Sequence, residues 1–145
     1  MTGTGRRGPR SEPVWRRTIQ HVAKRWIVDG MNVIGSRPDG WWRDRSGAMR
    51  ALAAQLDRFQ DDTGEPVLVV FDGRPREVPA RVEVRFASRA GCNAADDEIA
   101  RMVAADAAPG EVRVVTSDGD LATRVCAAGA EVEGAGTFRR RLDAV

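Results

Sequence analysis

The sequence predicts an α/β fold, an open and mostly parallel sheet of four or five strands with helices on both faces. Short runs of β-branched residues alternate along the chain with longer stretches of helical periodicity, and parallel neighbours need such crossover connections. One run, at 67–71, is apolar without interruption, as in a central strand that is covered on both faces. The length of 145 residues suits a single domain.

The first half of the chain contributes two strands and one helix. The first strand covers 26–28 and runs directly into an Asp-Gly pair. A helix is expected at about 43–62, because apolar residues recur there on one face. That face is formed by Ala48, Leu52, Leu56 and Phe59. The strand at 67–71 follows and also runs into Asp-Gly, which completes the first strand, helix and strand unit.

The second half of the chain continues the alternation. The predicted elements are a weak strand at 82–86, a helix from about 94 to the Pro-Gly pair at 109–110, a strand at 112–116, a helix at 118–128, an edge strand at 130–132 and a terminal helix at 137–144. The link between the strands at 67–71 and 82–86 is short for a parallel crossover and holds two prolines. The direction of the strand at 82–86 therefore stays open.

Basic residues concentrate at the N-terminal end. Residues 1–26 hold seven basic side chains against one acidic, whereas the rest of the chain holds 16 basic and 20 acidic. We predict a disordered basic arm at 1–23, followed by one domain at 24–145. Such an arm is usually a solvated tail and sometimes a tether for nucleic acid, and composition alone leaves both roles open.

Neither a membrane segment nor a cysteine framework is expected. No run approaches the ~20 apolar residues that span a bilayer, and no apolar segment follows the N-terminal arginines as in a signal peptide. We therefore expect a cytoplasmic protein that has no membrane partner. Cys92 and Cys126 have no CxxC pattern and no histidine nearby, which argues against a zinc site or a disulfide framework. Both are expected to be buried, reduced thiols.

Aspartates follow three of the predicted strands. They are Asp29, Asp72 and Asp118, and two more, Asp96 and Asp97, fall in the first turn of the helix that starts near 94. Ligands of open α/β sheets bind outside the carboxyl ends of the strands, so these side chains are expected to gather at one edge. Each aspartate also has an ordinary structural interpretation, as a turn residue after a strand or as a helix cap.

A cluster of carboxylates at one edge predicts a metal site. Carboxylates held close together repel one another and raise each other's pKa, unless a cation lies among them. An all-oxygen set without histidine or cysteine favours a hard ion, Mg²⁺ or Mn²⁺. Such ions, singly or in pairs, activate water for phosphodiester cleavage.

Four motifs in order give the chain a family resemblance. They are IVDGMNVIG at 27–35, VVFDG at 69–73, ADDEI at 95–99 and TSDGD at 116–120. Together they resemble the NYN branch of the PIN-like nucleases, most closely its YacP-like members, across about residues 25 to 133. The resemblance implies a PIN-like parallel α/β sheet and a Mg²⁺-dependent ribonuclease that hydrolyses RNA phosphodiester bonds.

The resemblance also implies roles for individual residues. Asp29, Asp96 and Asp118 match the main acidic positions of the family and Asn32 matches its polar companion. Secondary candidates for the metal are Asp72, Asp97 and Asp120. The helix after the first strand lacks the glutamate of the wider PIN pattern, which leaves one metal or two as open alternatives.

The loop after the first strand is a candidate RNA contact. It holds Arg37, Trp41, Trp42 and Arg43, which pair two aromatic faces with cations. This combination stacks unpaired bases and attracts the phosphate backbone. A tryptophan pair that covers the core is an equally good interpretation.

Two other function classes remain open from the sequence. Asp118 and Asp120 also fit the nucleophile and acid of a haloacid-dehalogenase-like phosphohydrolase, or the acidic pair of a Toprim-like site. The first alternative lacks a lysine in the body of the domain and the second expects a glutamate in place of Asp29. The other class is an RNA-binding module without catalysis, which the joint presence of the three main aspartates disfavours. The sequence identifies neither a protein partner nor the particular RNA.

Overall fold

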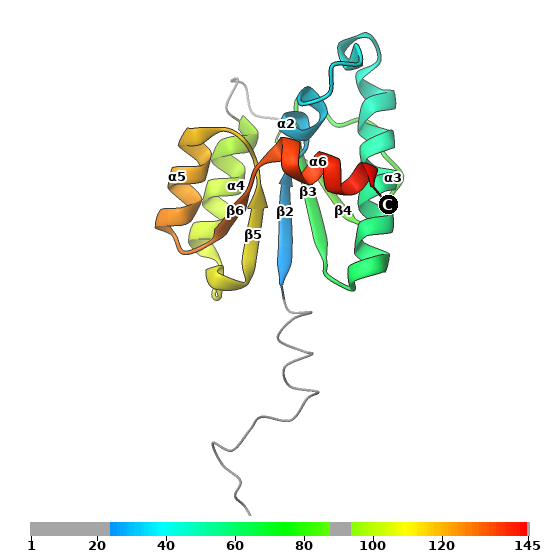
Figure 1. Ribbon diagram of the computed structural model, residues 1–145. Coiled ribbons are helices and arrows are strands. Elements are labelled where there is room, and N and C mark those ends of the chain that lie inside the picture. Colours follow the sequence, from blue (N-terminus) through cyan, green and yellow to red (C-terminus); the bar gives the residue numbers. More distant parts are fainter. Residues whose placement is uncertain (1–23, 88–93, 145) are drawn as a thin grey trace, which may run out of the picture.

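The computed structural model describes residues 24–87 and 94–144, which form a five-stranded, all-parallel sheet between two helical layers (Figure 1). The order of strands across the sheet is β4-β3-β2-β5-β6. Their bounds are β2 Arg25–Asp29, β3 Val67–Asp72, β4 Glu83–Ala87, β5 Val112–Val115 and β6 Glu131–Glu133. The α/β class and the parallel sheet expected from the alternating pattern are thus confirmed, and the predicted arm at 1–23 lies outside the described residues.

Five α-helices and two 3-10 turns connect the strands within the described part of the chain. The helices are α2 Gly30–Gly35, α3 Arg45–Thr63, α4 Ala94–Ala105, α5 Gly119–Ala127 and α6 Ala135–Asp143, and the 3-10 turns are η1 Trp41–Arg43 and η2 Pro109–Glu111. Four of the helices lie where periodicity predicts them, whereas α2 and η1 fall in a segment expected to be a loop. None of the described helices has the length and apolar character needed to cross a membrane.

Alternate residues of the central strands face two separate cores. Trp26 and Val28 of β2 pack with α2, α3 and α6 on one face of the sheet. Ile27 of the same strand packs with α4 and α5 on the other face. Both faces of β2 and β3 are therefore covered, which explains why their sequences are continuous apolar runs rather than alternating ones.

The short link between β3 and β4 makes a parallel connection without a helix. β4 pairs with β3 in parallel, with Val84 opposite Val69. The intervening segment packs Val78 and Ala80 against the core on the α3 side. One carboxylate oxygen of Asp57 in α3 accepts hydrogen bonds from the backbone N–H groups of residues 81 and 82, both at 2.9 Å. Asp57 thus satisfies two backbone N–H groups at the end of a link that has no helix of its own.

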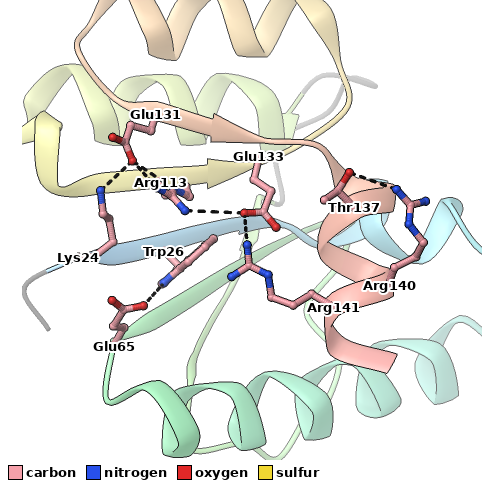
Figure 2. Close-up of polar contacts among 9 residues, drawn as sticks. All are labelled: Lys24, Trp26, Glu65, Arg113, Glu131, Glu133, Thr137, Arg140 and Arg141. Carbon is pink, nitrogen blue, oxygen red and sulfur yellow. Dashed lines mark hydrogen bonds and ion pairs between the residues drawn. The ribbon is translucent and has the colours of Figure 1, made fainter. Parts of the chain in front are cut away.

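The edge of the sheet at β6 is held by an ionic cluster (Figure 2). The Glu133 side chain is only 10% exposed and accepts a hydrogen bond of 2.7 Å from Arg141 of α6. The guanidinium groups of Arg113 and Arg141 lie 5.2 and 5.5 Å from the centre of the Trp26 ring. Oε2 of Glu133 has no hydrogen-bond partner among the described residues. These contacts fasten α6 to β5 and β6, close to the loop that carries Asp118.

The cysteine expectation is wrong at one of its two positions. Cys126 lies in the last turn of α5 and its side chain is exposed. Leu121 and Val125 occupy the inward face of that helix, and this leaves residue 126 on the solvent side. Cys92 lies outside the described residues.

Candidate active site

The β2 strand delivers Asp29 into a buried position at the carboxyl edge of the sheet. Asp29 is 4% exposed, and its Oδ2 accepts a hydrogen bond of 3.0 Å from the hydroxyl of Thr116 at the end of β5. Burial, helped by the charges of Asp72 and Asp118, raises the pKa of Asp29 to about 6, against the opposing effect of the Thr116 hydroxyl. A buried carboxylate among other carboxylates is costly to ionise, and a cation removes that cost.

Asp118 is placed by the start of α5. It is the N-cap residue of this helix, and its Oδ1 accepts a hydrogen bond of 3.0 Å from the N–H of Leu121. Its own N–H donates to the Thr116 hydroxyl at 3.1 Å. Thr116 therefore links the backbone of Asp118 to the carboxylate of Asp29. The predicted capping role of Asp118 is confirmed, and it brings the side chain to the site rather than away from it.

Asn32 secures the same loop from the opposite side. It lies on α2, one turn beyond Asp29, and its Oδ1 accepts a hydrogen bond of 2.8 Å from the N–H of Ser117. The Ser117 hydroxyl in turn accepts from the N–H of Ala135 at the start of α6, at 2.9 Å. The amide oxygen of Asn32 is thus engaged in holding the loop between β5 and α5. Within the described residues, its geometry is that of a positioning side chain.

Asp96 reaches the cluster from the first turn of α4. Its pKa is raised to about 7, first by desolvation and then by the charges of Asp29 and Asp118. The pKa of Asp118 is lowered, first by the N–H of Leu121 and also by a hydrogen bond with the carboxyl of Asp96. The structure therefore brings Asp29, Asp96 and Asp118 within mutual electrostatic influence, as expected for strands and helix starts at one sheet edge.

Asp72 supports the cluster from β3. Its Oδ1 accepts a hydrogen bond of 2.9 Å from the N–H of Ala95 and so closes the start of α4, next to Asp96. Asp72 contributes charge to the environment of Asp29 and Asp96 while it fixes the position of the helix.

Of the other secondary candidates, Asp120 lines a cavity beside the cluster and Asp97 does not. This cavity of about 380 Å³ is lined by Asp96, Asp118, Asp120, Leu121, Thr123 and Arg124. Asp97 instead forms an ion pair of 2.9 Å with Arg124, and both side chains are about half exposed. The sequence analysis did not select Arg124, although its position one turn after Asp120 on the predicted helix places it beside the aspartates.

The acidic cluster does not form a ready chelate. Among residues 24–87 and 94–144, no three acidic, histidine or cysteine side chains are grouped closely enough to hold one ion as they stand. The carboxylates nevertheless lie near enough to shift one another's pKa. All of them are oxygen donors, and two have a raised pKa. The donor chemistry therefore fits a hard divalent cation, and side-chain rotation is required to complete its coordination.

The aromatic candidates occupy the η1 turn above α3. Trp42 is 58% exposed, and its ring meets that of Trp41 edge to face, with ring centres 6.0 Å apart. The Arg43 guanidinium lies 6.0 Å from the centre of the Trp42 ring. Arg37 differs from these residues, because both of its terminal nitrogens bond the carboxylate of Asp143 at 3.1 and 2.6 Å. The structure leaves Trp42 and Arg43 accessible and ties the partly buried Arg37 to α6.

Comparison with known proteins adds family evidence to this geometry. Residues 26–145 match the family described as the YacP-like NYN domain. Two solved structures of YacP (Rae1) from Bacillus subtilis are similar to the chain. The first has 28% sequence identity and a TM-score of 0.68, and the match covers 83% of this chain and 74% of the YacP chain. The second, a mutant, has 27% identity and a TM-score of 0.69, and the match covers 83% of this chain and 76% of the mutant chain. A search of curated proteins finds no significant match.

Proposed function

The chain belongs to the YacP-like NYN domain family of PIN-like nucleases, and from this premise we propose that it is a metal-dependent ribonuclease that hydrolyses RNA phosphodiester bonds at Asp29, Asp96 and Asp118. The observation that supports the proposal is that these three carboxylates, from β2, α4 and the start of α5, lie near enough to influence one another's ionisation. Two of them have a raised pKa because of burial and neighbouring negative charge.

Each of these side chains has a distinct role in the proposed site. Asp29 and Asp118 hold the ion, Mg²⁺ or Mn²⁺, and Asp96 completes or orients its shell of water. When bound, the ion lowers the pKa of a water molecule and neutralises charge on the phosphate. The Thr116 hydroxyl keeps Asp29 oriented, at 3.0 Å. The hydrogen bond from Ser117 to Asn32 keeps the loop of Asp118 against α2.

The residues around this centre favour RNA as the substrate. We place Trp42 and Arg43 along the path of the RNA strand, because an exposed indole with a guanidinium over it stacks bases and attracts phosphates. Arg124 lines the cavity beside Asp96 and Asp118 and supplies a cation for a neighbouring phosphate. Of the secondary metal candidates, Asp120 lines this cavity, while Asp72 acts through α4 and Asp97 through its ion pair with Arg124.

The test is cleavage of cellular RNA with Mg²⁺ or with EDTA by the wild type and by Asp118→Asn. Asparagine caps a helix as well as aspartate, so this variant keeps α5 and loses only the charge. Asp62→Asn, an exposed change in the last turn of α3, is the matched control. We expect Mg²⁺-dependent cleavage by the wild type and the control, and none by Asp118→Asn.

Metal binding has a second readout that does not depend on activity. A ligand that binds only the folded state at 100 times its Kd stabilises it by about 2.7 kcal/mol. Mg²⁺ should therefore raise the Tm of the wild type and of Asp62→Asn, and raise that of Asp118→Asn less. Full cleavage in EDTA, or equal Mg²⁺ shifts in all three proteins, contradicts the metal mechanism. RNA binding without cleavage by the wild type favours the non-catalytic module instead.

A further inference from the structure

A cavity of about 470 Å³ opens between α2, the η1 turn and α3. Its volume is within the range of small-molecule sites, roughly 300 to 1,000 Å³. Apolar and aromatic groups form one part of its wall and polar side chains form the other. These are Ile34, Trp41 and Leu52 on the apolar side and Arg37, Asp39, Gln55 and Arg58 on the polar side. None of the three main aspartates lines this cavity, so it is a separate site.

The cavity lies one short helix away from the candidate active site. α2 begins at the residue after Asp29 and has six residues, and Ile34 near its end lines the cavity. At 1.5 Å per residue, the five steps from Asp29 to Ile34 span about 7.5 Å along the helix. The η1 turn and the start of α3 lie at the same end of the sheet as the start of α2 (Figure 1). The separation along α2 is about the spacing of neighbouring nucleotides in an extended strand, which makes the cavity a candidate for a base next to a phosphate held at the aspartates.

The polar wall is fixed in place before any ligand arrives. Arg37 donates to Gln55 at 3.1 Å and to Asp143 through two hydrogen bonds. Gln55 donates to the same carboxylate at 2.9 Å. These bonds lower the pKa of Asp143 to about 2, with the Arg37 hydrogen bond as the largest cause. The groups thus form a rigid hydrogen-bonding edge opposite an apolar surface and an indole ring.

Three arginines lie at or near the cavity: Arg58 lines it together with the carboxylate of Asp39, and Arg43 and Arg45 flank it on the tryptophan pair. The guanidinium of Arg45 lies 5.2 Å from the centre of the Trp41 ring, and that of Arg43 lies over Trp42. Neither of them, nor Arg58, forms an ion pair with another residue in the described part of the chain. A flat apolar slot with a polar edge and a cationic rim suits a heterocyclic base that is attached to a phosphate backbone. An apolar peptide side chain would use the slot and leave the cations without partners.

We propose that this cavity is a subsite for one unpaired nucleobase of the RNA, next to the phosphate that is cleaved. The inference rests on the proposed ribonuclease function and adds a preference for single-stranded RNA. The base stacks on Trp41, and its polar edge meets Gln55 and Arg58. Stacking of one base on an aromatic side chain contributes roughly 5- to 150-fold in affinity.

The experiment fills the cavity from an exposed helix position. Ala51 lines the cavity on the solvent side of α3, so Ala51→Leu occupies the slot with a residue that favours helices. Ala104→Leu, at an exposed position of α4, is the matched control. Ala54→Leu, at another exposed position that lines the cavity, gives a second independent test. Thermal unfolding verifies that each variant is folded.

Binding is measured in EDTA with a short unpaired RNA and with an abasic oligonucleotide of equal length. We expect both cavity variants to bind the RNA at least fivefold more weakly than the wild type and the control, and to bind the abasic strand equally well. With Mg²⁺ and saturating RNA, the cleavage rate should be unchanged while KM rises. Equal RNA affinity in all proteins overturns the subsite, as does an equal loss for the abasic strand.

The outcomes for the subsite and for the ribonuclease are separable. A loss of RNA affinity in the cavity variants, without cleavage by any of the proteins, supports the subsite and overturns the proposed ribonuclease. Mg²⁺-dependent cleavage with unchanged RNA affinity in every variant supports the ribonuclease and overturns the subsite. Binding of neither strand by the wild type overturns both proposals.

Discussion

Gly30 is the position where a single methyl group should disturb both the fold and the site. It is buried at the start of α2, directly after Asp29, and its φ is not in the left-handed region, so its backbone does not require glycine. A Cβ at this position would lie 2.5 Å from Cδ1 and Cε1 of Phe71 and 3.0 Å from Cγ2 of Val69. Phe71 is fully buried and packs against Phe86, with ring centres 5.6 Å apart, so its ring has no space to retreat.

Gly30→Ala should therefore destabilise the protein. Overpacking of a dense core costs typically 1 to 3 kcal/mol, and the better helix propensity of alanine offsets less than about 1 kcal/mol of that. We expect a net loss of about 1 to 2 kcal/mol, or a Tm lower by roughly 3 to 10 °C in a domain of this size. A shift of α2 also moves Asn32 and the loop that it holds, so RNA cleavage should fall as well.

The matched control lies at the other end of the same helix. A Cβ at Gly35 would meet no heavy atom within 4 Å. Gly35→Ala should therefore leave the Tm unchanged or raise it, since alanine reduces the entropy of the unfolded chain by an equivalent of about 0.4 to 1 kcal/mol. Thermal unfolding followed by circular dichroism measures both variants. A Tm for Gly30→Ala equal to or above that of Gly35→Ala would refute the packing argument.

Three further changes probe the start of α4, the start of β2 and the N-terminal segment. Asp72→Ala should lose about 1 kcal/mol of stability with the hydrogen bond to Ala95, whereas Asp72→Asn should retain it; denaturant unfolding compares the two. Asp106→Asn removes the ion pair with Arg25 that lowers the pKa of Asp106 to about 2, a partly exposed contact that contributes about 1 kcal/mol after screening by solvent. Because that folded-state pKa is depressed, the contribution is present above about pH 4 and disappears as the pH falls toward 2. The Tm difference between wild type and Asp106→Asn should shrink over that window, and a constant difference would contradict this assignment. Deletion of 1–23 should weaken RNA binding and flatten its salt dependence with turnover at saturating RNA nearly preserved; an unchanged salt slope would make this segment a solvated tail.

Most of the fold could be predicted because its signals are local. Apolar periodicity located α3, and an uninterrupted apolar run located β3, to within a few residues of the observed bounds. The direction of β4 was not available from spacing, because its link to β3 packs on α3 and bonds Asp57, contacts between residues about 24 positions apart in the chain. The short α2 was also missed, since six residues are too few to show a helical period.

The sequence could predict which edge of the sheet carries the aspartates. It could not predict the contacts that each side chain makes. The topology of a parallel sheet brings Asp29 and Asp118 to one edge wherever the strands end. The partners of Arg37 could not be inferred, because Asp143 lies 106 residues later in the chain and meets it only through the packing of α6. Turn chemistry was one of two interpretations of the Asp-Gly pair at 29–30, whereas the structure explains Gly30 by the close approach of the Phe71 ring.

Helix capping and the proposed metal binding are not competing explanations for the aspartates, because the caps are what place the carboxylates. Asp118 gives one oxygen, Oδ1, to the N–H of Leu121, and Asp72 gives one oxygen to the N–H of Ala95. A carboxylate has a second oxygen, and the cap fixes the direction in which it points. Two substitutions at residue 118 separate the role of the cap from the role of the negative charge. Asparagine preserves the cap and removes the negative charge, whereas serine preserves the cap but shortens the side chain. If the cap alone matters, both variants retain Mg²⁺-induced stabilisation and cleavage; if the charge matters, both lose them while α5 stays folded.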